Sequence, residues 1–146
     1  MGKKKVIQKS GDMNPAKEAG TAPVTGKTSS RKIESGTVYV NATYNNTLIT
    51  VTDASGNVVA WSSAGAMGFS GPKKATPFAS SKVAMTVIEK IKKNGPFNVH
   101  IVVKGVGSGR DSAVRTFAAQ GFSIISVKDA TPIPHNGPRP PKVRRV

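Results

Sequence analysis

The sequence has no cysteine and few acidic residues, and both shortages exclude classes of function. Without cysteine the chain can form no disulfide, no thiolate nucleophile and no cysteine-based zinc site. Only 7 Asp and Glu stand against 22 Lys and Arg in 146 residues, so the formal net charge is +15. A charge of this size repels itself on a small protein and is typical of a protein that binds a polyanion.

Long apolar runs are also missing. No apolar stretch follows the basic N-terminus, so this segment does not have the pattern of a secretory signal. A membrane-spanning helix would need about 20 consecutive apolar residues, and binding at a membrane surface would need a basic amphipathic helix. Neither pattern stands out in the sequence. We therefore expect no membrane contact, a cytoplasmic location, and nucleic acid as the polyanion.

Charge and composition divide the chain into three parts. Residues 1–35 are basic and poor in large apolar side chains, which predicts a disordered N-terminal extension. Residues 36–130 carry the hydrophobic periodicity of a single α/β domain. Residues 131–146 form a basic tail in which repeated Pro favours extended backbone over a packed fold.

Hydrophobic periodicity within the domain predicts the order β-β-β-α-β-α-β. Asn45-Asn46 is expected to adopt positive φ in a hairpin between the first two strands. Residues 99–103 are nearly all apolar, as in a strand that is covered on both faces. The sequence predicts five strands, at residues 37–43, 47–52, 58–62, 99–103 and 122–127.

Two helices are predicted between these strands. Thr76 suits the N-cap of the first helix, with Pro77 at its first position. Ser108 and Asp111 fit a capping box at the start of the second helix. Strand–helix–strand units form parallel pairs with right-handed crossovers. We therefore expect a mixed five-stranded sheet with helices packed against it.

The glycine-rich loop at residues 105–109 leads from a strand into a helix, where backbone amides favour an anion. RNA phosphate is the favoured ligand, with Ser108 and Arg110 as its expected contacts. A tight connection without a ligand is one alternative, and a dinucleotide site is another. Asp129 follows at the spacing of a dinucleotide site, but Arg110 replaces the third glycine of that motif.

Two ring side chains have ordinary structural interpretations. Trp61 is the only Trp, and at the end of a strand it is expected to pack in the core rather than to stack on a base. His100 lies in an apolar strand and is expected to be a packed residue rather than a metal ligand. We expect no metal and no cofactor.

Motifs along most of the chain resemble one family. They run from about Gly36 to Val146, and together they are highly specific. They resemble ribosomal protein eleven of the small subunit, and His135-Asn136-Gly137 is similar to its bacterial and organellar branch. The stretches that carry the resemblance are Asn45-Asn46-Thr47, Thr52-Asp53, Gly56-Asn57, Trp61, Gly68-Phe69, Lys73-Lys74, Thr76-Pro77-Phe78-Ala79, Gly107-Ser108-Gly109-Arg110, Arg115, Asp129 to Gly137, Arg139-Pro140-Pro141-Lys142 and Arg144-Arg145-Val146.

The resemblance implies a ribonuclease H-like fold, a three-layer α/β/α sandwich. It also implies a structural role on the platform of the small ribosomal subunit, near the messenger exit region. The implied partners are small-subunit ribosomal RNA and neighbouring platform proteins, with messenger RNA near the exit region as a further candidate. The domain at residues 36–130 would then bind RNA together with the two basic ends.

Charge, loop position and the resemblance together predict the RNA-binding residues. Asn45 and Asn46 also meet a turn requirement, and Thr76 has capping as its alternative role. His135 is equally suited to base stacking and to resting on its turn. The predicted residues in the N-terminal extension and the domain are Lys3, Lys4, Lys5, Asn45, Asn46, Thr47, Phe69, Lys73, Lys74, Thr76, Ser108, Gly109, Arg110 and Arg115. The predicted residues in the tail are Pro134, His135, Asn136, Gly137, Arg139, Pro140, Pro141, Lys142, Arg144 and Arg145.

Enzymatic activity is not expected. Ribonuclease H-like nucleases need several carboxylates that converge on two metal ions, and the first predicted strand has no acid at all. Glu34, Asp53, Glu89 and Asp111 fall at a chain entry, a turn, a helix end and a cap, so they do not converge. No nucleophile motif surrounds the Ser and His residues. The two alternative hypotheses for the function are a ribonuclease H-like nuclease and a fragment of a nucleotide-binding enzyme.

Overall fold

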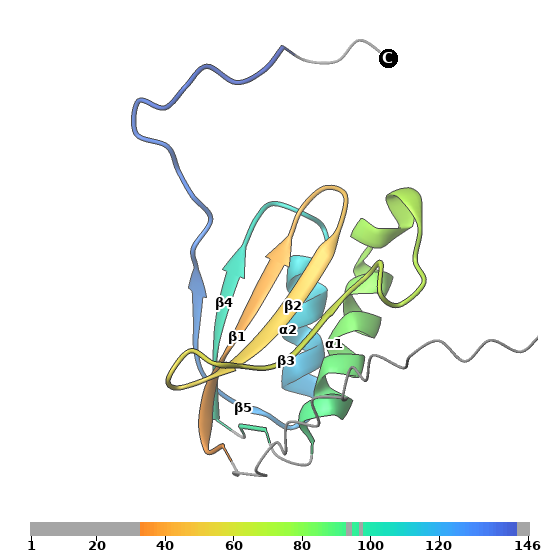
Figure 1. Ribbon diagram of the computed structural model, residues 1–146, viewed down its shortest axis with the longest axis vertical. Coiled ribbons are helices and arrows are strands. Elements are labelled where there is room, and N and C mark those ends of the chain that lie inside the picture. The colour runs from red at the N-terminus through yellow and green to blue at the C-terminus, as the bar shows by residue number, and fades with distance from the viewer. Residues whose placement is uncertain (1–32, 93–94, 97, 143–146) are drawn as a thin grey trace, which may run out of the picture.

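A computed structural model describes residues 33–92, 95–96 and 98–142 (Figure 1). The predictions for Lys3, Lys4, Lys5, Arg144 and Arg145 lie outside these residues. The elements are β1 (Ser35–Ala42), β2 (Thr47–Asp53), β3 (Val58–Ser63), the 3₁₀ helix η1 (Gly71–Ala75), α1 (Pro77–Ile91), β4 (Asn98–Lys104), α2 (Arg110–Ala119) and β5 (Ser123–Asp129).

The five strands form one mixed sheet in the order β3-β2-β1-β4-β5. β1 pairs antiparallel with β2, and β2 pairs antiparallel with β3, as a meander requires. β4 pairs parallel with both β1 and β5, so each helix connects parallel strands. The α/β class, the mixed five-stranded sheet and the predicted order of elements are confirmed.

The hydrophobic core lies on one face of the sheet. Alternate residues of β1, β2 and β4 are fully buried there, among them Val38, Ile49 and Ile101. α1 packs against β2 and β3, α2 packs against β1 and β4, and the two helices contact each other. Phe117 of α2 is the largest fully buried side chain, and its ring meets Phe122 edge-on at 5.8 Å between centroids.

The second face of the sheet carries no helix in the described part of the chain. The described fold therefore has two layers, the sheet and the helices, and not the three layers of the expected α/β/α sandwich. Both helical connections run in the same direction across the sheet, from β3 to β4 and from β4 to β5. Right-handed crossovers in one direction place their helices on one face. The expectation that residues 99–103 are covered on both faces is wrong for the same reason. In β4, His100 is exposed and Val102 is only half-buried.

The hairpin between β1 and β2 does not use positive φ. Of the described residues other than glycine, Asn136 alone has a positive φ, so this expectation for Asn45 and Asn46 is wrong. Thr43 orders the connection instead. Its Oγ1 accepts hydrogen bonds from the N–H groups of Asn45 at 3.4 Å and Asn46 at 3.1 Å, and its own N–H donates to the carbonyl of Asn46 at 2.9 Å.

Candidate RNA interface

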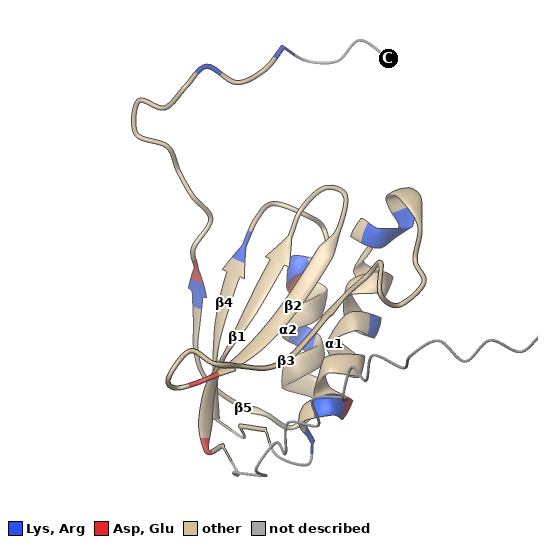
Figure 2. Cartoon of the chain, in the orientation of Figure 1, with Lys and Arg blue, Asp and Glu red and all other residues tan. Residues whose placement is uncertain are grey.

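Several basic residues lie at the end of the sheet to which β1, β4 and β5 point (Figures 1 and 2). The hairpin at residues 43–46, the loop at 105–109, η1 and the start of the tail all lie at this end, which we call the loop end. Lys104 is the last residue of β4, and Lys128 is the last residue but one of β5. Acidic residues at the opposite end of the sheet include Glu34 and Asp53, which flank the start of β1 and the end of β2.

η1 presents two lysines just before α1. Lys73 is exposed and Lys74 is half-buried, and both lie in the last turn of η1. The prediction that Thr76 is the N-cap of α1 is confirmed, because its Oγ1 accepts a hydrogen bond from the N–H of Ala79 at 3.3 Å. The same hydroxyl donates to the carbonyl of Lys73 at 2.8 Å. The Thr76 side chain thus holds the two lysines against the helix start.

Two aromatic residues, Phe69 and Phe78, flank η1 in the sequence. Phe69 is half-buried against the core and meets Phe78 edge-on, with 6.1 Å between ring centroids. The ammonium group of Lys82 lies 5.7 Å from the centroid of the Phe78 ring. The predicted residue Phe69 therefore has a packing role, whereas the Phe78 ring is 64% exposed.

The loop at residues 105–109 is pressed against the hairpin. A Cβ on Gly105 would collide with the carbonyl oxygen of Ala42, and Gly105 has a φ of +97°. Gly107 N–H donates to the same Ala42 carbonyl at 2.9 Å. Glycine is required here because the backbone of the loop touches the backbone of Ala42. The close approach that these glycines permit is therefore made to the protein itself and not to a ligand.

The start of α2 is packed rather than capped by a side chain. Gly109 is the N-cap, and a Cβ there would lie 2.8 Å from Ser80 Cβ and from Thr47 Oγ1. Ser108 Oγ donates to the carbonyl of Ala75 at 2.9 Å, so the predicted capping box of Ser108 and Asp111 is wrong. The hydroxyl of Ser108 instead joins the loop to η1. Thr47 and Gly109 are buried, so the contacts proposed below leave them out.

Arg110 makes two strong internal contacts at the loop end. Its Nη2 lies 2.7 Å from Asp129 Oδ2, and its Nη1 donates to the carbonyl of Gly105 at 2.8 Å. Hydrogen bonds from Arg110 and from the hydroxyl and N–H of Thr131 hold the pKa of Asp129 well below its usual range. The hydrogen bond to Asp129 likewise raises the pKa of Arg110. In a dinucleotide site the carboxylate of Asp129 would bind a ribose, but here it is paired with Arg110.

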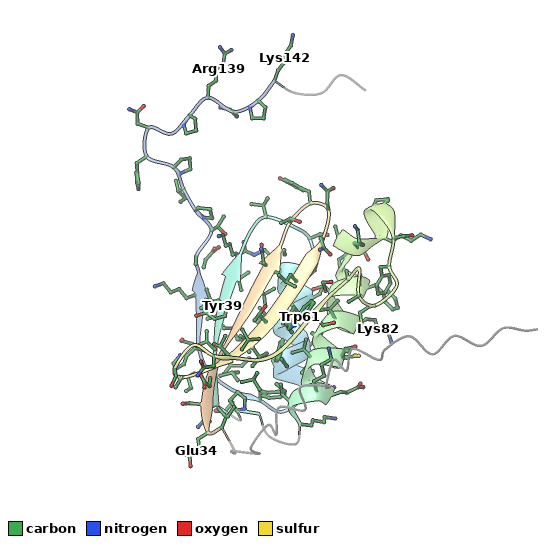
Figure 3. The ribbon with its side chains drawn as sticks, in the orientation of Figure 1. Glu34, Tyr39, Trp61, Lys82, Arg139 and Lys142 are labelled. Carbon is green, nitrogen blue, oxygen red and sulfur yellow. The ribbon has the colours of Figure 1, made fainter. Side chains whose placement is uncertain are left out.

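The tail extends away from the domain (Figure 3). Residues 132–142 are exposed, and Arg139 and Lys142 project from the extended chain. Asn136 has a φ of +53°, which turns the tail at the predicted Asn-Gly position. A Cβ on Gly137 would lie 2.9 Å from Pro134 Cβ, so this turn is tight. The tail displays its cations to solvent from the loop end.

The open face of the sheet carries residues that the sequence did not point to. One row of register partners crosses the whole sheet, and it consists of Trp61, Thr50, Tyr39, Val102 and Lys128. Trp61 is 56% exposed, so the prediction that it packs in the core is wrong. Knowing which face the helices cover would have revealed this row, because side chains alternate along each strand.

Two further predictions concern His100 and Arg115. His100 is exposed, and its Nδ1 lies 2.8 Å from Ser126 Oγ, so the packed residue expected from the sequence is a surface residue. Arg115 is exposed on α2. Among the residues that the structure describes, no group of three His, Cys, Asp or Glu could hold a metal ion. Within the same residues, no helix has the length and apolar character to cross a membrane.

A basic end and an exposed basic tail on an α/β domain are typical of the class of nucleic-acid-binding proteins. The family model for Ribosomal protein S11 matches residues 36–145, and the chain belongs to this family. The resemblance seen in the sequence is thereby confirmed. As a member of the family, the chain is an RNA-binding structural protein of the small ribosomal subunit and takes part in translation.

Proposed function

We propose that the chain binds small-subunit ribosomal RNA on the platform, near the messenger exit region. Its neighbours there are other platform proteins, and messenger RNA at the exit is a further candidate partner. The ribosome is of the bacterial or organellar type and lies in the cytoplasm or the organelle, and the role is structural rather than enzymatic. The family match and the bacterial-type His135-Asn136-Gly137 sequence support this proposal.

One observation carries the proposal: the tail leaves the domain at the loop end, where η1 and the ends of β4 and β5 carry lysines. Arg139 and Lys142 therefore extend the same positive region as Lys73, Lys104 and Lys128. Extended cationic segments enter RNA crevices that a globular surface cannot reach. Each cation near a phosphate releases counterions, so this term makes binding strongly dependent on salt.

Three parts of the chain share the work in this proposal. Residues 36–130 form the RNA-binding domain, residues 131–146 form the tail, and residues 1–35 form a basic extension that adds electrostatic attraction through Lys3, Lys4 and Lys5. The proposed contacts of the domain and the tail, taken from the predicted set, are Asn45, Asn46, Lys73, Lys74, Ser108, Arg115, Pro134, His135, Asn136, Gly137, Arg139, Pro140, Pro141, Lys142, Arg144 and Arg145.

A charge-matched pair of variants tests the role of the tail. In the first variant, Arg139 and Lys142 are both replaced by Gln; in the control, Lys90 and Lys92 at the far end of α1 are replaced by Gln. Both variants lose two positive charges. The affinity for a transcript of the platform region is measured against salt concentration.

The tail variant is expected to bind more weakly, and its slope of log affinity against log salt is expected to fall by roughly 0.7–0.9 for each lost phosphate contact. The control is expected to keep the slope of the natural protein, because its lysines lie away from the loop end. Equal slopes in the two variants would show that the position of the charges is irrelevant and would contradict the proposal.

A further inference from the structure

We infer that Asp129 and Arg110 are positioning residues that fix the direction in which the tail leaves the domain. In this arrangement the cations of the tail and those of the loop end face one RNA surface. The inference rests on the proposed function, because it concerns how the tail is presented to RNA. In this inference Arg110 helps to position the tail and does not make the phosphate contact that was expected from the sequence.

A closed ring of hydrogen bonds surrounds the root of the tail. Arg110 bonds to Asp129 and to the carbonyl of Gly105, as described above. Asp129 Oδ1 accepts from the N–H of Thr131 at 2.9 Å and from its hydroxyl at 2.6 Å. The hydroxyl oxygen of Thr131 in turn accepts from Gly105 N–H at 3.1 Å. The ring joins the loop, the start of α2, the end of β5 and the first residue of the tail.

This ring is the last attachment of the tail to the domain in the described residues. The backbone ladder ends just before it, where Ala130 N–H donates to the carbonyl of Val103 at 2.8 Å. After Thr131, no described residue of the tail is hydrogen-bonded to the domain. Extended chain adds about 3.1 Å per residue, so a small rotation at Thr131 displaces Lys142 much further than it displaces the root.

Electrostatics alone would disfavour an acid at this position. Asp129 lies among the cations of the loop end, and its partner Arg110 is neutralised by the pair. Removing Asp129 raises the net charge by one and, if charge alone mattered, would strengthen RNA binding. If Asp129 positions the tail, its removal weakens binding instead, because preorganisation is lost. The two explanations therefore predict opposite signs.

Asp111 provides a charge-matched control. Its Oδ1 lies 4.0 Å from Arg110 Nε, its side chain is 81% exposed, and it takes no part in the ring. Asp129→Asn and Asp111→Asn raise the net charge equally. We expect Asp129→Asn to lower the affinity for the platform transcript several-fold and Asp111→Asn to leave it unchanged or raised. If Asp129→Asn bound as tightly as Asp111→Asn, the inference would be overturned.

A second variant guards against a folding defect in Asp129→Asn. Thr131→Val removes the hydroxyl that joins Gly105 to Asp129 and leaves every charge in place. It is expected to weaken RNA binding in the same direction, with a thermal midpoint close to that of the natural protein. Unchanged binding by Thr131→Val would mean that the ring does not act on the tail.

A double-mutant comparison separates positioning from a general structural role. Asp129→Asn is introduced into full-length protein in which Arg139, Lys142, Arg144 and Arg145 are replaced by Gln. If Asp129 acts through the tail, its effect on affinity disappears in this background, because coupled residues are not additive. Persistence of the full several-fold loss would overturn the inference.

A direct readout of tail direction is available because the chain has no cysteine. Spin labels are attached to single cysteines introduced at Ala119 in α2 and at Ile133 in the tail, both exposed. The distribution of distances between the labels is expected to broaden in Asp129→Asn, and an unchanged distribution would contradict the inference. Failure of the natural protein to bind the transcript would instead contradict the proposed function.

Discussion

The domain and the tail of this protein are ordered by different interactions. In the domain, β1, β2 and β4 pair edge to edge and press their apolar side chains against two helices. In the tail, no described side chain beyond Thr131 is buried, and Ile133 is 78% exposed. The region that matches the family model, residues 36–145, therefore contains one part whose sequence specifies a packed core and one part whose sequence exposes charge.

The largest effect on stability is expected in the core of the domain. Phe117→Ala removes the largest fully buried side chain and its edge-on contact with Phe122. It is expected to lower the free energy of unfolding by about 3–5 kcal/mol, from lost burial and the cavity left behind. Urea denaturation measures this loss. Phe78→Ala, at a ring that is mostly exposed, is the control and is expected to cost much less.

A smaller effect is expected where α2 begins. Gly109→Ala places a methyl group 2.8 Å from Ser80 Cβ and Thr47 Oγ1, although the φ of −79° suits any residue. Overpacking of this kind costs about 1–3 kcal/mol, and the same denaturation experiment measures it. Gly65→Ala is the control, because its Cβ would find no neighbour closer than 3.9 Å. Equal stability of the two variants would contradict the packing described at the loop end.

The smallest effect on stability is expected in the tail. Replacing Arg139 and Lys142 by Gln is expected to change the free energy of unfolding by less than about 0.5 kcal/mol, as for other exposed sites. The same variant is expected to change RNA binding. Thermal unfolding of the RNA-free protein checks the first expectation, and a clear drop in the midpoint would mean that the tail packs on the domain.

Local signals in the sequence predicted most of the fold correctly. Thr76 and Pro77 mark the start of α1, and runs of β-branched and apolar residues placed five strands within two residues of their ends. Both depend on neighbours along the chain. Errors arose where a distant contact decides the outcome. Ser108 bonds to Ala75 rather than capping α2, and Trp61 is exposed because the helices cover only the other face.

In the candidate site, too, features that depend on neighbouring residues were predicted, and features that depend on distant contacts were not. Composition alone was enough to predict the basic tail, because exposed Pro and Arg need no tertiary partner. The pairing of Arg110 with Asp129 was not predicted, because the two residues meet only when β5 is placed beside β4. The glycines of the loop at 105–109 suggested an approaching ligand, whereas Ala42 is the group that they approach.

The exposure of Trp61 gives the protein a natural optical reporter. It is the sole indole of the chain, and on the open face of the sheet it forms one end of the row of register partners whose other end is Lys128. Indole emission moves to shorter wavelength when water leaves the ring. The wavelength of the fluorescence of unlabelled protein therefore reports whether Trp61 stays in contact with water when the protein enters the small subunit.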